Sequence, residues 1–354
     1  MAEFFFEYGL FAAKLATFVV AILVVVIVSV GASRRVKKSM KGHIETSRVN
    51  DEIDAMRDAI DAGVSDPDSL KLHVKQKQKQ QKRERKARKK ALARAGGEIE
   101  ADAKPRVFVL DFVGNLKASA VSNLRREITA VLSMARARDA VVVRLESGGG
   151  MVHAYGLASS QLQRIRDRGI DLTVCVDKVA ASGGYMMACV ANRILAAPFA
   201  ILGSIGVVAQ LPNFHRWLQK NDIDFELITA GEYKRTLTMF GENTDKGREK
   251  FVEELEETHG LFKDFVSSNR PSLDIAKVAT GEVWYGQKAI EEGLIDEILT
   301  SDSFVQDRLT DWDVYEVKFV HKKNWQEKLG LAAEGAMEKA FLRIWQKGQE
   351  RSNY

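Results

Sequence analysis

Strand-like and helix-like segments alternate along the middle of this 354-residue chain. The runs RVFVLDF (106–112), AVVVRLE (140–146) and DLTVCV (171–176) are short, apolar and rich in β-branched residues, which is typical of buried strands. Helical stretches that run through residue 133 and near residues 155–168 separate them. Two more strands are expected at 193–197 and at FELIT (225–229). This alternation predicts an α/β fold.

Ser182 lies where the strand at 171–176 gives way, through a small-residue turn, to a buried helix expected up to residue 191. At the start of a helix, free backbone N–H groups and the positive end of the dipole stabilise developing negative charge. The glycines that follow Ser182 leave room for a substrate backbone. A simpler interpretation makes Ser182 an N-cap and the glycines packing devices.

Two glycine-rich segments follow other predicted strands. Residues 147–150, SGGG, come directly after the strand at 140–146. Consecutive glycines there would expose backbone N–H groups at the carboxyl edge of the sheet, where an oxyanion hole could be built. The segment ILGSIGV (201–207) places the hydroxyl of Ser204 between glycines. Either segment could also be an ordinary turn.

The order of five motifs resembles the S49 peptidase family, the signal peptide peptidase A group. The motifs are SGGG, DKVAASGGY (177–185), ILGSIGV, GEYKR (231–235) and GEVWYGQKAIEEGLIDEI (281–298). The resemblance covers residues 105–300 and implies a peptidase domain there, built as a Clp/crotonase-like superhelix of β-β-α units. It also implies a homo-oligomer in which catalytic groups can meet across subunits. The long N-terminal extension matches the branch of the family that has a single anchor.

The resemblance assigns roles to five residues. Ser182 would be the nucleophile and Lys234 the general base, while Ser204 would hydrogen-bond the lysine amine and orient it. Gly149 and the N–H of Gly183 would form the oxyanion hole. At position 148 the family more often has proline than glycine, so the donor within the loop stays open among Gly148, Gly149 and Gly150.

A lysine base makes a chemical demand. A free lysine has a pKa of about 10.4, so it is protonated at neutral pH and cannot accept the serine proton. Burial against apolar walls favours the neutral amine. Tyr233, Leu237, Met239 and Phe240 are the walls that the sequence offers around Lys234. Without such walls, Lys234 would be a solvated surface charge.

Histidine is the rival base. Of the six histidines, we expect His153 alone to lie near the site, and we interpret it as a surface residue of a loop or helix. The chain has no H-E-x-x-H motif and no paired-cysteine motif, so neither a metal nor another cofactor is expected. Cys175 and Cys189 lie in apolar contexts and are expected to be buried thiols.

The first hundred residues do not resemble a core. Residues 15–33 form an uncharged apolar run that would span about 28 Å as a helix, close to the hydrocarbon thickness of a bilayer. We therefore divide the chain into an anchor segment (1–33), a basic juxtamembrane tether (34–104), the catalytic domain (105–300) and a C-terminal extension (301–354). An amphipathic helix is expected over 243–269 and another over 324–347, which packs on its own domain or on a neighbouring subunit.

The charge is concentrated in the tether. Residues 34–41 carry five basic residues, and residues 71–94 carry twelve basic residues against one acid, Glu84. Removing these +5 and +11 charges from the net +5 of the chain leaves −11 for the rest. An acidic remainder argues against a nucleic-acid enzyme, so the basic run is interpreted as a tether near anionic lipid, with an RNA-binding tail as the alternative. The basic flank after residue 33 favours a cytoplasmic location for that side, whereas the family includes peptidases of the periplasmic face.

Taken together, these features predict a serine endopeptidase anchored in a bacterial inner membrane, which cleaves hydrophobic peptides such as signal-peptide remnants or membrane-protein fragments. One alternative is a crotonase-like acyl-CoA hydratase or hydrolase, which would share the fold but needs no serine nucleophile. The other is a membrane scaffold whose peptidase fold has lost its activity. The presence of Ser182, Ser204 and Lys234 argues against both.

Overall fold

The computed structural model describes residues 42–66 and 104–321, with single positions 68, 75, 79, 82, 83 and 86 between them. Its contacts divide the chain into a unit formed by Ile44–Phe319 and a second unit formed by Met1–His43 and Val320–Tyr354. The predicted anchor, most of the basic tether and the predicted helix over 324–347 lie outside the described residues. Within the described ranges, no helix is both long and apolar enough to cross a bilayer.

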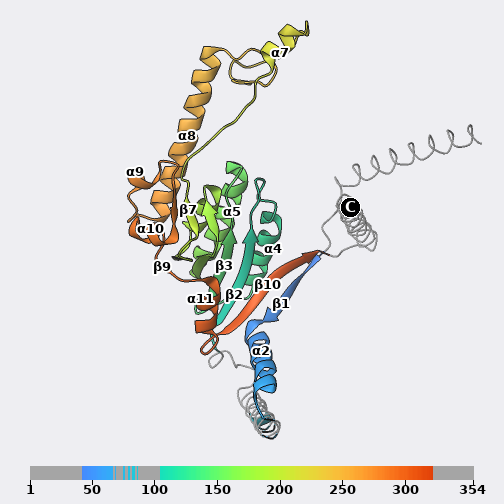
Figure 1. The fold of residues 1–354 in the computed structure, drawn as a ribbon, viewed down its shortest axis with the longest axis vertical. Helices are drawn as coiled ribbons and strands as arrows, with labels where there is room; N and C mark the ends of the chain where they lie inside the picture. The colour runs from blue at the N-terminus through green and yellow to red at the C-terminus, as the bar shows by residue number, and fades with distance from the viewer. Residues whose placement is uncertain are drawn as a thin grey trace, which may run out of the picture. The chain divides into compact units, whose positions relative to one another are not determined.

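A seven-stranded sheet forms the centre of the larger unit (Figure 1). The pairs that run from β10 through β2, β3, β4 and β6 to β9 are all parallel. The strands, in spatial order, are β1 (Gly42–Arg48), β10 (Asp313–His321), β2 (Arg106–Val113), β3 (Ala140–Glu146), β4 (Asp171–Val176), β6 (Arg193–Ala196) and β9 (Glu297–Ile298). An α/β fold with a parallel core is therefore present, as the alternating pattern predicted.

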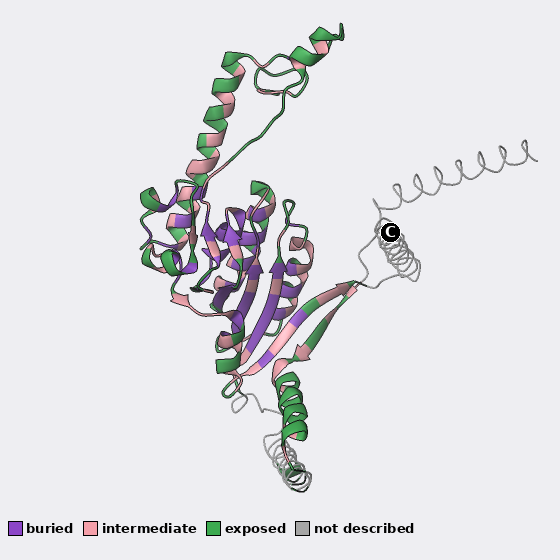
Figure 2. Cartoon of the chain, in the orientation of Figure 1, coloured by how far each residue is buried: buried purple, intermediate pink, exposed green. Residues whose placement is uncertain are grey.

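Helices cover both faces of this sheet. Alternate residues of β2, β3 and β4 pack with α4 (Val121–Leu132), α5 (Val152–Arg166) and α6 (Gly183–Ala188) in the larger apolar core. The opposite residues of the same strands pack with α11 (Ser301–Arg308) in a smaller core. Burial on both faces explains why these strands are continuous apolar runs rather than alternating ones. Figure 2 shows the buried residues concentrated in these strands and helices.

A second, three-stranded sheet leads to the candidate site. It consists of β5 (Val179–Ala181), β7 (Ile201–Gly203) and β8 (Val283–Tyr285), with β5 and β7 parallel and β8 antiparallel to β7. Ser147, directly after β3, forms a parallel bridge to Ala180 of β5. The chain thus passes from β4 in the large sheet to β5 in the small one and then into α6. This succession brings the ends of β3, β5 and β7 together.

Elements at both ends of the catalytic segment belong to the same unit. At the N-terminal side it includes α2 (Val49–Val64), which the sequence placed in the tether. At the C-terminal side it includes α11 and most of β10, which the sequence placed in the C-terminal extension. Strand β10 pairs with β2 in register from Asp313 and Arg106 onward. The body that supports the site is therefore wider than residues 105–300.

An arm, residues 209–257, extends away from the two sheets (Figure 1). It contains α7 (His215–Lys220) and the first half of α8 (Asp245–Asn269), whose second half returns to the body and buries Phe262 and Val266. Gly241 is the one buried residue of the arm. The predicted strand at 225–229 is wrong, because this segment is exposed and pairs with no strand of the described chain. The predicted helix over 243–269 is confirmed as α8.

The remaining elements complete the body beside β8. They are α9 (Ile275–Val278) and α10 (Gly286–Glu291). Helix α10 ends before Gly293, whose φ of +76° suits glycine at a helix C-terminus, and the chain then enters β9. The predicted sequence of helix, glycine stop and strand over 286–298 is therefore confirmed. Cys175 and Cys189 are buried free thiols, as predicted, and burial raises the pKa of each to about 12.

Candidate active site

Ser182 occupies a strained turn between β5 and α6. Its backbone has φ +52° and ψ −119°, a conformation that costs a non-glycine residue on the order of 1–3 kcal/mol. Two bonds hold it there: the Ser182 N–H donates to the Gly203 carbonyl (2.8 Å), and the Ser182 carbonyl accepts from the Met186 N–H (2.9 Å). The Ser182 side chain makes no capping bond to α6, so the N-cap interpretation does not describe its hydroxyl.

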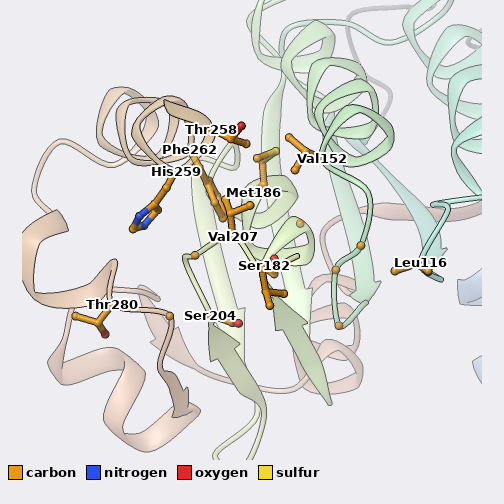
Figure 3. Close-up of a pocket in the computed structure, with 17 residues that line it drawn as sticks. Leu116, Val152, Ser182, Met186, Ser204, Val207, Thr258, His259, Phe262 and Thr280 are labelled. Atoms are coloured by element: carbon orange, nitrogen blue, oxygen red, sulfur yellow. The ribbon is translucent and has the colours of Figure 1, made fainter. Parts of the chain in front are cut away.

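The Ser182 side chain faces a pocket of about 690 Å³ (Figure 3). One wall comes from Leu116, the glycine loop 148–150 and Val152. The other walls come from Ser204 and the residues after it, from α8 and from the turn at residues 280–281. Apart from His259, no titratable side chain lines the pocket within the described residues. The site is therefore a cleft of mixed character, in which apolar side chains alternate with hydroxyls and backbone groups.

The glycine loop lies directly against Ser182. A Cβ built on Gly149 would be 2.7 Å from the Ser182 Cβ and 2.8 Å from the Gly183 nitrogen. Real side chains do not approach so closely, and the φ of +88° at Gly149 also favours glycine. The two predicted oxyanion-hole residues, Gly149 and Gly183, are thus brought together beside Ser182.

The backbone N–H of Gly149 already has a partner. It donates to the Ser147 Oγ at 3.1 Å, a bond that points it toward the protein interior. The N–H of Gly183 belongs to the first turn of α6, whose leading N–H groups have no acceptor within the helix. To act as an oxyanion donor, the Gly149 N–H would therefore have to divide its hydrogen bond between the oxyanion and Ser147 Oγ. The Gly183 N–H would not have to be divided in this way.

Ser204 also lines the pocket, at the end of β7. Its backbone has φ +51°, and its N–H donates to the Glu282 carbonyl at 2.6 Å. Because the preceding residue, Gly203, accepts the N–H of Ser182, one short segment positions both serines. The structure brings Ser182, Ser204, Gly149 and Gly183 to a single pocket.

Lys234 is not part of this pocket within one chain. It lies in the arm, in a turn where its N–H donates to the Gly231 carbonyl at 3.2 Å, and its side chain is exposed. Three of its predicted walls, Tyr233, Met239 and Phe240, are themselves 37–46% exposed. The Nζ atoms of Lys246 and Lys250 lie 5.9 and 5.5 Å from the centre of the Tyr233 ring. A single copy of the chain therefore leaves Lys234 in a solvated environment.

The structure singles out a different histidine from the one chosen by sequence position. His153 is exposed on α5 and does not line the pocket, whereas His259 on α8 does. The His259 Nε2 is buried without a hydrogen-bond partner. Figure 3 shows His259 near Phe262, on the side of the pocket opposite Leu116. Its position depends on the packing of α8 through Phe262 and Val266, for which the sequence around His259 carries no signal.

The described residues also bear on metal binding. Among them, no group of three or more His, Cys, Asp or Glu side chains is placed to hold a metal ion. The chemistry that the pocket offers is that of a serine hydroxyl on a strained strand-to-helix turn with backbone N–H groups beside it. A sharp turn of this kind exposes the nucleophile in one large class of serine hydrolases.

Comparison with known proteins agrees with this chemistry. The model of the peptidase family S49 N-terminal region matches residues 3–162, and that of peptidase family S49 matches residues 164–314. Probable protease SohB from Haemophilus influenzae is 51% identical over 92% of this chain and 92% of its own length. Probable protease SohB from Buchnera aphidicola subsp. Schlechtendalia chinensis is 47% identical over 86% of this chain and 100% of its own length.

A solved structure is also similar to the chain. It is a mutant of the 1510-N membrane-bound stomatin-specific protease in complex with a substrate peptide. The match has a TM-score of 0.40 and 15% identity, and it covers 64% of this chain and 96% of the other.

Proposed function

Because this chain belongs to peptidase family S49 and is a peptidase, we propose that it is a serine endopeptidase with Ser182 as its nucleophile. One observation carries the proposal: Ser182 lies on a strained turn at a pocket, with Gly149 and the Gly183 nitrogen against it. A strained non-glycine residue persists only where its surroundings enforce it, and such residues cluster at active sites. The match to peptidases also removes the basis for the acyl-CoA alternative.

We assign the general base to Lys234, supplied by a neighbouring copy of the chain. An exposed lysine is protonated at neutral pH, and burial disfavours the charged form. Docking of the arm on a second copy would cover Lys234 and carry it to a pocket in which the described chain places no lysine. Ser204 lines that pocket and would accept a hydrogen bond from the incoming amine.

The surface of the arm supports this assembly. Eleven large apolar side chains of the arm are 37–90% exposed. They are Leu211, Phe214, Trp217, Ile223, Phe225, Leu227, Ile228, Tyr233, Met239, Phe240 and Val252. Apolar residues gathered on one projecting segment mark a protein or membrane contact rather than a free surface. A homo-oligomer would bury them.

The reaction then follows in two stages. Neutral Lys234 Nζ takes the proton from Ser182 Oγ as the oxygen attacks the scissile carbonyl carbon, and the carbonyl electrons move onto its oxygen. The Gly183 N–H, with a donor from the glycine loop, stabilises that oxyanion. When the C–N bond breaks, the lysine ammonium protonates the departing amine. Water, deprotonated by the same lysine, next hydrolyses the acyl-enzyme and restores the Ser182 hydroxyl.

The walls of the pocket support hydrophobic substrates. Leu116, Val152, Met186, Val207 and Phe262 line it, so an extended apolar peptide would bury surface on binding. Signal-peptide remnants and membrane-protein fragments have this character. We further propose that residues 15–33 anchor the chain in a bacterial inner membrane, near such substrates, and that the fold is a Clp/crotonase-like superhelix of β-β-α units.

Hydrolysis of hydrophobic fluorogenic peptides by full-length protein in detergent tests the proposal. Ser182→Ala should abolish both turnover and labelling by a fluorophosphonate. Ser160→Ala is the matched control, because Ser160 is exposed on α5 and donates its hydroxyl to the Gly156 carbonyl. A folded wild-type protein that neither cleaves the panel nor labels would contradict the proposal and favour the scaffold alternative.

A further inference from the structure

A buried chain of hydrogen bonds connects the glycine loop to Tyr155. The Gly149 N–H donates to Ser147 Oγ (3.1 Å), Ser147 Oγ lies 2.5 Å from Tyr155 Oη, and Tyr155 Oη donates to the Asn115 carbonyl (2.9 Å). Tyr155 has no exposed surface, and Ser147 is 1% exposed. Neither side chain reaches the pocket, so neither has a direct part in the proposed reaction.

The donors in this chain have one consistent direction. A carbonyl oxygen can only accept, so the single Tyr155 proton goes to Asn115. Tyr155 Oη must then accept the proton of Ser147 Oγ, which leaves the Ser147 lone pairs for the Gly149 N–H. Burial raises the pKa of the Tyr155 phenol, which keeps it protonated in this role. Each of the two hydroxyl groups in this series of hydrogen bonds thus has a partner to donate to and a partner to accept from. If either hydroxyl changed partner, a neighbouring group would be left unpaired.

The ring of Tyr155 also supports the other side of the oxyanion hole. A Cβ built on Gly183 would lie 2.4 Å from the Tyr155 Cγ, so the ring packs directly on the Gly183 backbone. Ser147 is fixed in turn to β5, because its N–H donates to the Val179 carbonyl (2.8 Å) and its carbonyl accepts from the Ala181 N–H (3.0 Å). One buried side chain thus contacts the Gly183 backbone directly and reaches the glycine loop through the Ser147 hydroxyl.

We propose that Tyr155 is a positioning residue that fixes the separation of the glycine loop and Gly183 on either side of Ser182. Its hydroxyl holds the loop through Ser147, and its ring sets the position of Gly183. Three consecutive glycines have no side chains to hold their own conformation, so external bonds must hold the loop. The Met151 N–H fixes its far end on the Leu116 carbonyl (2.9 Å), and the Gly149 N–H bond to Ser147 fixes its middle. This inference rests on the proposed function, because the separation matters catalytically only if an oxyanion forms there.

Kinetics of three full-length variants test it. Tyr155→Phe keeps the ring but removes the hydroxyl, and Ser147→Ala removes the middle of the chain. Tyr185→Phe is the matched control, because Tyr185 is equally buried and donates to the Leu294 carbonyl at 2.9 Å, away from the loop. We expect Tyr155→Phe and Ser147→Ala to lower kcat by about 10²-fold, the cost of a small misplacement, with KM nearly unchanged. Tyr185→Phe should leave both constants near wild type.

Binding of two ligands separates positioning from general damage. A peptide aldehyde forms a hemiacetal with Ser182 that places an oxyanion in the hole, whereas the matching peptide alcohol binds without one. Tyr155→Phe should weaken the aldehyde by about the same factor as kcat and leave the alcohol unchanged. Equal loss for both ligands, or equal effects of Tyr155→Phe and Tyr185→Phe, would overturn the inference.

Hydrogen exchange tests the structural step without activity. Amides of residues 147–151 should exchange faster in Tyr155→Phe than in wild type and stay unchanged in Tyr185→Phe. Unchanged exchange in Tyr155→Phe would overturn the inference even if the enzyme is active. Full activity in Ser182→Ala would instead mean that the proposed nucleophile is wrong. Hydrogen exchange does not depend on activity, so it distinguishes that result from a failure of the Tyr155 proposal.

Discussion

The surroundings of Ser182 and of Lys234 differ in burial and in the contacts that hold each residue. Ser182 is held between β5 and α6 by backbone bonds, with buried glycines and Tyr155 packed around its turn. Lys234 lies on an arm whose residues are exposed or half-buried almost throughout, as Figure 2 shows. The body buries its apolar side chains within one chain, whereas the arm leaves most of its own exposed. The contrast is the main reason to place the base in one copy and the nucleophile in another.

The first prediction concerns the base itself. Lys234→Ala should lower kcat by about 10²- to 10⁴-fold, because the serine proton then has no acceptor. Lys220→Ala, an exposed lysine on α7 of the same arm, should keep wild-type activity. Steady-state hydrolysis of one peptide measures both. Equal losses in the two variants would mean that the arm contributes only general charge, and the special status of Lys234 would be lost.

The second prediction concerns the surface of the arm. Trp217 is 61% exposed, so Trp217→Asp should leave the unfolding midpoint of the body unchanged. It should nevertheless dissociate the oligomer and reduce activity at least about tenfold, because charge in the core of an apolar interface is costly. Sedimentation velocity with an activity assay reports both effects. Gln219→Asp adds the same charge on the same helix and should change neither the oligomeric state nor the activity. An intact oligomer in Trp217→Asp would contradict the proposal that the arm forms the contact between copies.

The third prediction contrasts ion pairs in the body and the arm. Arg270 donates two bonds to Asp296 (2.9 and 2.8 Å), and the Ile194 N–H donates a third (2.7 Å). Burial alone would raise the pKa of Asp296, but these bonds outweigh it and the pKa is lowered. Asp296→Asn should therefore cost about 2 kcal/mol of unfolding free energy at neutral pH. In the arm, Glu232 pairs with Lys246 at 2.6 Å in full solvent, and Glu232→Gln should leave the unfolding midpoint unchanged.

The pH dependence of this stability follows from the lowered pKa. The contribution of ionised Asp296 is complete above the unfolded pKa, about 3.9, and is lost as the pH falls through the lower folded pKa. Wild type should therefore lose its stability advantage over Asp296→Asn in acid. Denaturant unfolding between neutral pH and pH ~3 measures the difference. A constant difference across that range would contradict the assignment.

The smallest expected effects separate the two histidines. His259 lines the pocket with a buried, unpartnered Nε2, so His259→Ala should lower kcat/KM a few fold by changing the substrate-binding wall. His153 is exposed outside the pocket, and His153→Ala should behave as wild type. The same peptide assay serves for both. A large loss of kcat in His153→Ala would instead place a histidine base at the site.

The parts of the fold that the sequence predicted are those in which local pattern and burial agree. Runs such as residues 140–146 are buried on both faces, so their composition alone indicates a strand. Residues 225–229 have a similar composition, but no strand within the described chain pairs with them. Strand propensity reflects packing against neighbours, and the described chain supplies none for this segment.

The candidate site also has a part that the sequence predicted and a part that it missed. Ser182, Ser204 and the glycines follow strand ends, so their meeting follows from the sheet topology. The contributions of His259 and Tyr155 depend instead on helix packing. His259 reaches the pocket because Phe262 and Val266 dock α8 on the body, and Tyr155 reaches Ser147 because α5 lies over the glycine loop. No local motif marks either residue.

Complementation between two inactive variants tests the central claim most directly. Ser182→Ala and Lys234→Ala chains carrying different tags would be co-expressed, and mixed oligomers isolated through both tags. If Lys234 serves Ser182 of a neighbouring copy, mixed oligomers should regain about a quarter to a half of wild-type activity, because a site is intact only where a chain with Ser182 receives the arm of a chain with Lys234. Mixed oligomers no more active than either variant alone would contradict the shared site and return both residues to one chain.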